Sequence, residues 1–155
     1  MTGAIPAVTV RRAHADELPR LATWNADLIR DERHDSAMSV PELEARLRGW
    51  LTEGYAAYVF EAGGEAFGYA LFRELDDCMH LRHFFVVPHH RRRGLGRRAL
   101  ERLREEVFVP DKRILVEVLV WNAEGAAFWK SVGFAERYLG LQMPGWTPSS
   151  SPKEN

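Results

Sequence analysis

The densest run of residues that could do chemistry is RRRGLGRR at positions 91–98, where two glycines stand among arginines. It follows an apolar run that ends at Pro88, and the helical pattern ALERLREEV comes next. Glycine lets backbone N–H groups approach a ligand closely, and the first N–H groups of a helix have no partner within it. The helix dipole adds about 0.3–1 kcal/mol for a nearby anion. The stretch therefore predicts a phosphate or pyrophosphate site surrounded by Arg91, Arg92, Arg93, Arg97 and Arg98.

Two common phosphate-binding motifs do not match this stretch. A nucleotide P-loop needs four residues between its glycines, followed by Gly-Lys-Ser or Gly-Lys-Thr, and these are absent. A dinucleotide-binding fingerprint needs a third glycine, but position 99 is alanine. The glycines alone leave two interpretations open, a phosphate site and a basic helix start without a ligand.

The elements around this stretch predict a mixed α/β sandwich in one domain. Apolar periodicity and turn residues predict strands at 7–13, 55–62, 65–75, 79–87, 113–120 and 134–143, and helices at 15–32, 39–54, from 95 onward, and 122–133. The nearly all-apolar segment 113–120 is typical of a strand inside a sheet. Ser39 is the expected cap of the second helix, and Gly63-Gly64 the expected turn of a hairpin. The helix from 95 onward has an apolar stripe at Leu95, Ala99, Leu100, Leu103 and Val107. We expect a single domain over residues 1–146 and a flexible tail over 147–155, which is rich in proline and serine.

The amino-acid composition excludes several classes of protein. The chain has 155 residues, 46% of them apolar, and a formal net charge of -1, so its surface as a whole is not built for nucleic acid. The single cysteine, Cys78, cannot form an internal disulfide, which fits a reducing compartment. We do not expect Cys78 to act as a nucleophile. No segment has the pattern of a signal peptide or membrane span. We therefore expect a cytoplasmic protein that binds neither nucleic acid nor membranes.

Two motifs resemble the GNAT superfamily of N-acetyltransferases. RRRGLG, following a strand that ends in VVP, is similar to the coenzyme A motif of that family. VEVLVWNAEGAAFWKSVGF, at 116–134, is similar to the family's strand, Asn-capped helix and Gly-Phe ending. The element order also matches over about residues 7–143. The motif residues are most similar to those of polyamine and small-amine acetyltransferases. The resemblance implies a central mixed, mostly antiparallel sheet, splayed at the coenzyme A site, with helices on both faces.

The resemblance also implies how acetyl-CoA, as co-substrate and without a metal, would bind. Main-chain amides from Arg92 to Arg97, around Gly94, Leu95 and Gly96, would hold the pyrophosphate, with Arg91 beside them. Main-chain groups of Phe84, Phe85 and Val86 would pair with the pantetheine arm and polarise the acetyl carbonyl. Asn122 would contact the pantetheine region at the splay.

One position departs from the family pattern. The family often has a tyrosine seven residues after that asparagine, as the acid for the departing thiolate, and here this position is Trp129. An indole N–H donates a hydrogen bond but is not an acid at neutral pH. Either the thiolate leaves with hydrogen-bond help alone, or another group serves, with Tyr138 as a distant candidate.

The acceptor of an N-acetyltransferase is an amine, which is mostly protonated at neutral pH and needs a base. His83 is the preferred base, because imidazole titrates near neutral pH and the residue precedes Phe84. The resemblance implies that acceptor contacts come from the first two helices and their loop. Asp31 and Glu32 there suit a cationic amine, and Asn25 lies about two helical turns upstream, whereas Arg82 suits a carboxylate. Arginine and histidine at 82 and 83 replace the acidic pair of the polyamine enzymes, which weakens a polyamine assignment.

The sequence thus favours acetyl transfer from acetyl-CoA to a primary amine of a small molecule or peptide, by direct attack in a ternary complex. The alternative is a degenerate acyl-CoA-binding sensor or scaffold without turnover, suggested by Trp129. A homodimer is compatible with the resemblance, although no sequence patch identifies an interface.

Overall fold

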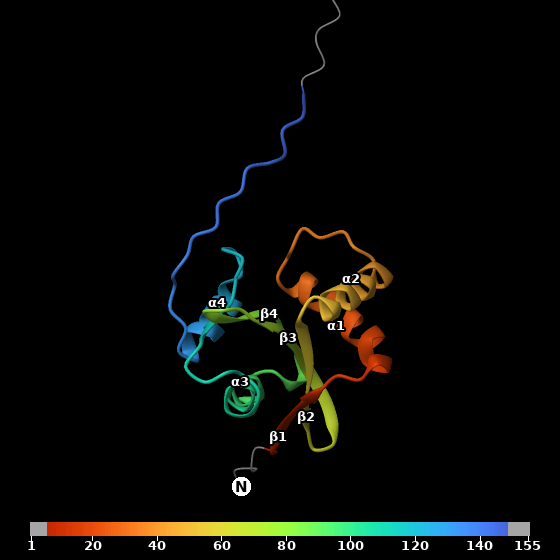
Figure 1. The fold of residues 1–155 in the computed structure, drawn as a ribbon, viewed down its shortest axis with the longest axis vertical. Helices are drawn as coiled ribbons and strands as arrows, with labels where there is room; N and C mark the ends of the chain where they lie inside the picture. The colour runs from red at the N-terminus through yellow and green to blue at the C-terminus, as the bar shows by residue number, and fades with distance from the viewer. Residues whose placement is uncertain (1–5, 149–155) are drawn as a thin grey trace, which may run out of the picture.

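A five-stranded sheet forms the centre of the computed structural model, which describes residues 6–148 (Figure 1). The strands lie in the order β1-β2-β3-β4-β5. Their bounds are β1 (Val8–Arg12), β2 (Tyr55–Ala62), β3 (Glu65–Glu74), β4 (Cys78–Val86) and β5 (Arg113–Leu115). Neighbouring strands are antiparallel, except that β4 and β5 pair in parallel. The prediction of a mixed, mostly antiparallel sheet is confirmed.

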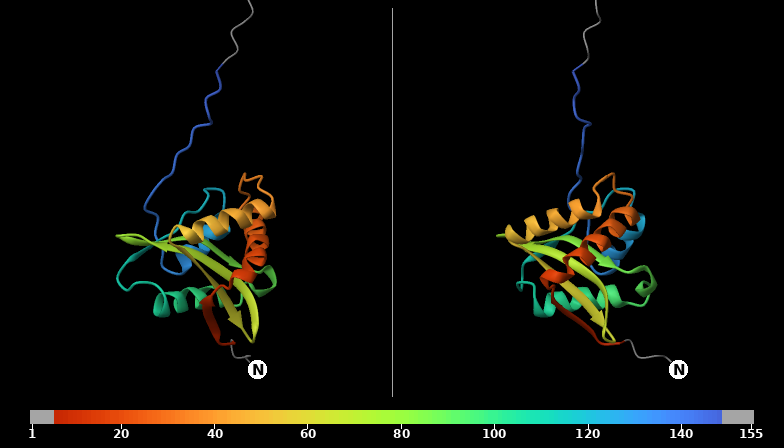
Figure 2. Two further views of the ribbon diagram at one scale, coloured as in Figure 1. Left: turned by 45° about the vertical axis from the view of Figure 1, so that its right-hand side comes forward. Right: turned by 90° about the vertical axis from the view of Figure 1, so that its right-hand side faces the viewer.

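Helices cover both faces of the sheet, as predicted. Their bounds are α1 (Leu18–Asp31), α2 (Val40–Thr52), α3 (Leu95–Glu106) and α4 (Ala123–Ser131), with short 3-10 turns η1 (Ala15–Glu17) and η2 (Pro88–His90). Helices α1 and α2 lie on one face, and α3 and α4 lie on the other (Figures 1 and 2). The predicted cap of α2 forms, because the Ser39 hydroxyl accepts from the Glu42 amide while the Glu42 carboxylate reaches back to Ser39.

Strand alternation divides the core into two clusters. On β3, Tyr69 and Leu71 pack toward α1 and α2, whereas Ala70 and Phe72 pack toward α3. The buried stripe of α3 is the one predicted from the sequence, Leu95, Ala99, Leu100 and Leu103. Each face of the central strands thus packs in a separate apolar cluster, and the sheet lies between two helical layers.

Two strand predictions in the C-terminal part are wrong. The segment 113–120 forms a strand only at Arg113–Leu115, and β5 is an edge strand of the sheet instead of an interior one. The segment 134–143 has no strand, and Leu139, Leu141 and Met143 are exposed as the chain leads away from the domain (Figure 1). Both segments have strand-like composition, but a strand needs a paired neighbour for its backbone groups, and β5 ends too early to supply one.

The tail predicted over 147–155 lies, apart from its first two residues, outside the described residues. Among the helices of the described part, none is both long and apolar enough to cross a membrane.

Candidate active site

The loop between β4 and α3 presents a run of free backbone amides. Arg92 and Gly94 have left-handed backbone, with φ of 61° and 74°, which turns the chain sharply into the helix. The amide of Arg91 donates to Pro88 and that of Arg98 donates to Gly94. Between them, the amides of residues 92–97 have no acceptor within the described part of the chain. Consecutive unpaired amides at a helix start can bind an anion, which is the kind of site that the sequence predicts here.

The residue types of this loop fit a diphosphate. A side chain at Gly96 would begin 3.5 Å from Val86 Cγ2 and 3.6 Å from Phe128 Cε2, so glycine keeps open the space between β4, α3 and α4. No carboxylate of the described residues pairs with Arg92 or Arg93. The loop therefore combines free N–H donors, unpaired positive charge and space, which is what a pyrophosphate requires.

The other arginines near this loop have partners in the protein. Arg91 forms an ion pair with Asp31 at 2.6 Å, and its Nε donates to the Val86 carbonyl. Arg97 donates to the Ser131 carbonyl. These contacts tie the loop to α1, β4 and α4, so Arg91 and Arg97 hold the loop in place. Asp31, which the sequence suggested for the acceptor, thus forms an ion pair with this loop.

Beyond the loop, one edge of β4 is open. The pairing of β4 with β5 covers Cys78 to His80 and stops there, so the segment from Phe84 to Val86 has no strand on that side in the described residues. Phe84 packs against Phe128 and Trp129, whereas Phe85 is buried on the α1 side. This is the splay that the resemblance implied, and it begins beside the free amides.

Asn122 stands at the far side of the splay as the N-cap of α4. Its Oδ1 accepts from the Gly125 amide at 3.0 Å. A Cβ on Gly125 would lie 2.4 Å from Asn122 Nδ2, so glycine at 125 makes room for the asparagine side chain. Glycine at position 125 is therefore matched to the cap.

A β-bulge in β4 controls which side chains reach the opposite face of the sheet. Leu71 on β3 pairs with His83, and Phe72 pairs with Leu81, so Arg82 is the extra residue. Leu81 consequently packs toward α3, whereas Arg82 and His83 both lie on the α1–α2 face. Sequence alternation did not reveal this bulge, although the two polar residues between Leu81 and Phe84 break the period of two and are its signal.

His83 is a buried, neutral imidazole. It is 9% exposed, its Nδ1 lies 3.0 Å from the Tyr69 hydroxyl, and the Trp50 ring meets it edge-on. Burial first, and then the positive charges of Arg46 and Arg82, lower the pKa of His83 from 6.5 to about 3. Burial also keeps the Tyr69 phenol protonated by raising its pKa above the normal range.

Glu32 lies at the end of α1, where two hydrogen bonds join the chain to Trp121. The Trp121 indole donates to the Glu32 carbonyl at 2.9 Å, and Arg33 donates to the Trp121 carbonyl at 2.7 Å. Burial, and then the neighbouring Asp31 carboxylate, raise the pKa of the Glu32 carboxyl. Glu32 therefore has greater proton affinity than an exposed glutamate.

The remaining predicted residues lie in different settings. Asn25 is buried, and its Oδ1 accepts from Arg46 at 3.3 Å. Trp129 packs its ring against Phe84 and Phe134 in the α3-side core. Tyr138 is 71% exposed, and its hydroxyl accepts from Arg137, so the structure does not bring it to the other candidates.

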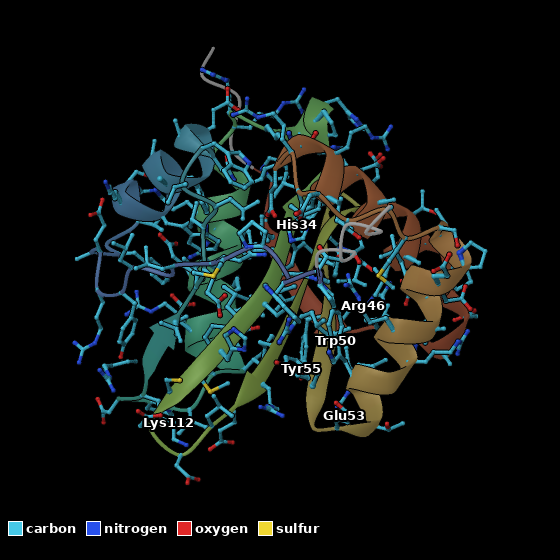
Figure 3. All side chains as sticks on the ribbon, turned by 90° about the horizontal axis from the view of Figure 1, so that it is seen from above. His34, Arg46, Trp50, Glu53, Tyr55 and Lys112 are labelled. Carbon is cyan, nitrogen blue, oxygen red and sulfur yellow. The ribbon has the colours of Figure 1, made fainter. Side chains whose placement is uncertain are left out.

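Four residues of the α1–α2 face were missed by the sequence reasoning as site residues: Arg46, Trp50, Tyr55 and Tyr69. They come from α2, β2 and β3, and only the packing of α2 over the strands brings them beside Arg82 and His83. Figure 3 shows Arg46, Trp50 and Tyr55 in a row between α2 and the sheet. No local sequence signal joins these positions.

Comparisons with known proteins agree with this geometry. The model of the acetyltransferase (GNAT) family matches residues 18–134. No curated protein sequence matches the chain. Among solved structures, a predicted acetyltransferase with acetyl-CoA from Clostridium acetobutylicum has a TM-score of 0.69 and 15% identity, covering 88% of this chain and 95% of its own.

Two further structures have names that describe their activity. The aminoglycoside N-acetyltransferase AAC(6')-Iy in complex with CoA has a TM-score of 0.66 and 16% identity, covering 94% of this chain and 100% of its own. The spermidine N-acetyltransferase from Vibrio cholerae, in complex with CoA and spermine, has a TM-score of 0.67 and 18% identity, covering 85% of this chain and 83% of its own. At these identities the likeness shows the fold, and the matched family model shows the family. The chain belongs to the GNAT acetyltransferase family, whose acyl donor is acetyl-CoA.

Proposed function

We propose that this protein transfers an acetyl group from acetyl-CoA to a primary amine by direct attack in a ternary complex. The observation that carries the proposal is the run of acceptor-free amides at residues 92–97, which opens directly onto the unpaired edge of β4. A donor held there would lie along the strand that carries Arg82 and His83 on its α1–α2 face. Membership of the family identifies acetyl-CoA as the donor, and the open edge of β4 gives the direction in which the donor would lie.

On the donor side, the amides from Arg92 to Arg97, which include those of Gly94, Leu95 and Gly96, would bind the pyrophosphate. The main chain of Phe84, Phe85 and Val86 would pair with the pantetheine amides and polarise the thioester carbonyl. Asn122 uses its Oδ1 for the helix cap, which leaves its Nδ2 as the donor for the pantetheine region.

Acetyl-CoA supplies a thioester carbonyl; the amine nitrogen bonds to its carbon, the carbon–sulfur bond breaks, and the sulfur leaves as thiolate. The amine must lose a proton, so the site needs a base. Glu32 suits this role at neutral pH because burial raises its pKa, whereas His83, with a pKa of about 3, binds a proton weakly. We therefore assign the base to Glu32, directly or through a water, and a neutral hydrogen-bonding role to His83.

The departing thiolate needs little acid help, since an alkyl thiol has a pKa of about 8.5. Trp129 can offer only an indole N–H, and its ring is packed in the core. Tyr138 would require the segment after α4 to fold back over the domain. A water is the simplest proton source for the thiolate.

The proposal is tested by incubating the protein with acetyl-CoA and a panel of primary amines while free thiol is measured. We expect amine-dependent thiol release and intersecting initial-rate patterns, as a ternary complex requires. Tight CoA binding without thiol release across the panel would favour the acyl-CoA sensor. A parallel-line pattern would contradict direct attack, because it indicates an acetylated enzyme.

The assignment of the base is tested with Glu32→Gln and His83→Asn. We expect Glu32→Gln to lower kcat/KM by about 10²–10⁴ and to flatten the acid limb of its pH profile. Glu53→Gln, at an exposed glutamate just after α2, is the matched control. A large loss in His83→Asn together with a normal Glu32→Gln would return the role to His83.

A further inference from the structure

Two guanidinium groups share one aromatic ring on the acceptor side of the sheet. The Cζ atoms of Arg46, from α2, and Arg82, from the β4 bulge, lie 4.5 Å and 4.7 Å from the centroid of Trp50. Arg82 also lies over the Tyr55 ring, and its Nε donates to the Tyr55 hydroxyl at 3.1 Å. Stacking on aromatic rings fixes the planes of both guanidiniums and leaves their edges available as paired donors.

Neither arginine has an acidic partner in the described residues. Arg46 donates from one terminal nitrogen to Asn25, and its Nε is buried without any acceptor. By comparison, Arg91 pairs with Asp31, and Arg48, also on α2, pairs with Glu44. A buried guanidinium N–H without an acceptor is costly unless a ligand supplies one.

The two charges also oppose each other. Burial, and then the charge of Arg82, lower the pKa of Arg46. The same two charges act on His83, which stays neutral beside them. An anion bound between the guanidiniums would relieve this repulsion, whereas a second cation would increase it.

We infer that the acceptor amine carries a carboxylate, bound by Arg46 and Arg82 beside Trp50, so that the substrates are amino acids or peptides and not polyamines. This inference deepens the proposed function and rests on it. Glu32 receives the amine end of the acceptor, and the two arginines receive its carboxylate end. Planar, bidentate recognition of a carboxylate is what two stacked guanidiniums provide.

The test compares lysine with cadaverine, which has the same primary amine and lacks the carboxylate, and ornithine with putrescine in the same way. Because charged hydrogen bonds are at stake, we expect kcat/KM to favour the carboxylate-bearing amine by about ten- to hundredfold. Arg46→Gln and Arg82→Gln should bring this ratio close to one. Arg48→Gln, on the exposed side of α2, should leave the ratio unchanged.

A binding measurement separates this inference from the proposed function. Nε-acetyllysine titrated into the CoA-loaded protein should quench tryptophan fluorescence and release heat, and both signals should be lost in Arg82→Gln. Thiol release with cadaverine at or above the lysine rate would overturn the inference while leaving acetyl transfer intact. Carboxylate binding without thiol release from any amine would remove the proposed function and retain the anion site.

Discussion

Arg82 and His83 show how one residue added to a strand changes the chemistry of a site. In a regular strand they would point to opposite faces, but the bulge at Arg82 turns both toward α1 and α2. His83 is then buried against Tyr69 and Trp50, which removes it from water and keeps it neutral. This position favours a neutral, hydrogen-bonding role for His83 in the function that we propose.

The buried histidine predicts a pH dependence of stability. The pKa of His83 falls from 6.5 to about 3 on folding, so the unfolded chain binds more protons between these values. The free energy of unfolding should therefore decrease as pH falls below about 6.5. His83→Asn, which keeps a side-chain acceptor for Tyr69 and does not titrate, should reduce this slope in urea titrations from pH 7 to pH 5.

The matched control is His89→Gln, at an exposed histidine of η2. Its slope between pH 7 and pH 5 should equal that of the parent protein. An unchanged slope in His83→Asn would contradict the buried neutral imidazole.

At the scale of elements, the donor side depends on how β4 passes into α3. The strand ends, η2 turns the chain, and α3 begins with its free amides toward the open edge of β4. Glycine has two different uses here. Gly94 supplies a left-handed backbone, whereas Gly96 supplies space between Val86 and Phe128.

The space at Gly96 predicts a separation of binding from folding. In Gly96→Ala the new Cβ makes ordinary contacts at 3.5–3.6 Å, so the melting temperature should not fall. CoA affinity should fall by about tenfold, since the methyl group enters the space next to the free amides. Calorimetry with CoA, together with a thermal melt, checks both. Unchanged affinity would argue against this loop as the pyrophosphate site.

Gly49→Ala is the control, because Gly49 lies within α2 with open space around it. It should raise stability by about 0.5–1 kcal/mol through helix propensity and leave CoA affinity unchanged.

Gly68 supports the same edge from β3. A Cβ there would lie 2.0 Å from the Phe85 carbonyl oxygen, which belongs to the backbone of β4 and cannot move aside easily. Gly68→Ala should therefore destabilise the protein by about 1–3 kcal/mol or more, measured by chemical denaturation. A variant as stable as the parent would show that β3 and β4 can shift apart without cost.

At the scale of the whole molecule, ion pairs join segments that are distant in the sequence. Arg91 pairs with Asp31 and so links the donor loop to α1. Arg11 on β1 pairs with both Glu17 of η1 and Glu61 of β2, which anchors the entry to α1 against the sheet edge. The position of α1, and with it that of Glu32, depends on such links.

The Arg11–Glu17 pair predicts sensitivity to acid. Hydrogen bonds from Arg11 lower the pKa of Glu17 from 4.5 to about 2, so its contribution is complete above pH 4.5 and is lost as pH falls toward 2. Glu17→Gln should flatten the loss of stability in that range, followed by circular dichroism. Glu124→Gln, at an exposed glutamate of α4, should retain the parent slope. A Glu17→Gln variant with that same slope would contradict the link.

Much of the molecule was determined by local sequence. The α3 stripe, the Ser39 cap, the Gly63–Gly64 hairpin and the free amides around Gly94 follow from periodicity and residue type, and the structure confirms them. These features depend on neighbours a few residues apart, so a single stretch contains the information. The acetyltransferase family could be recognised from two such stretches, because the proposed donor site is made mostly of backbone.

The acceptor side was decided by the tertiary structure. Arg46, Trp50, Tyr55, Tyr69 and Arg82 come from α2, β2, β3 and β4, and only helix packing and a strand bulge bring them together. The strand predicted at 134–143 is absent for a related reason. Its composition is typical of a strand, but no neighbouring strand of the described residues pairs with its backbone. Side-chain charge and burial depend on neighbours distant in sequence, and so therefore does the acceptor that we propose.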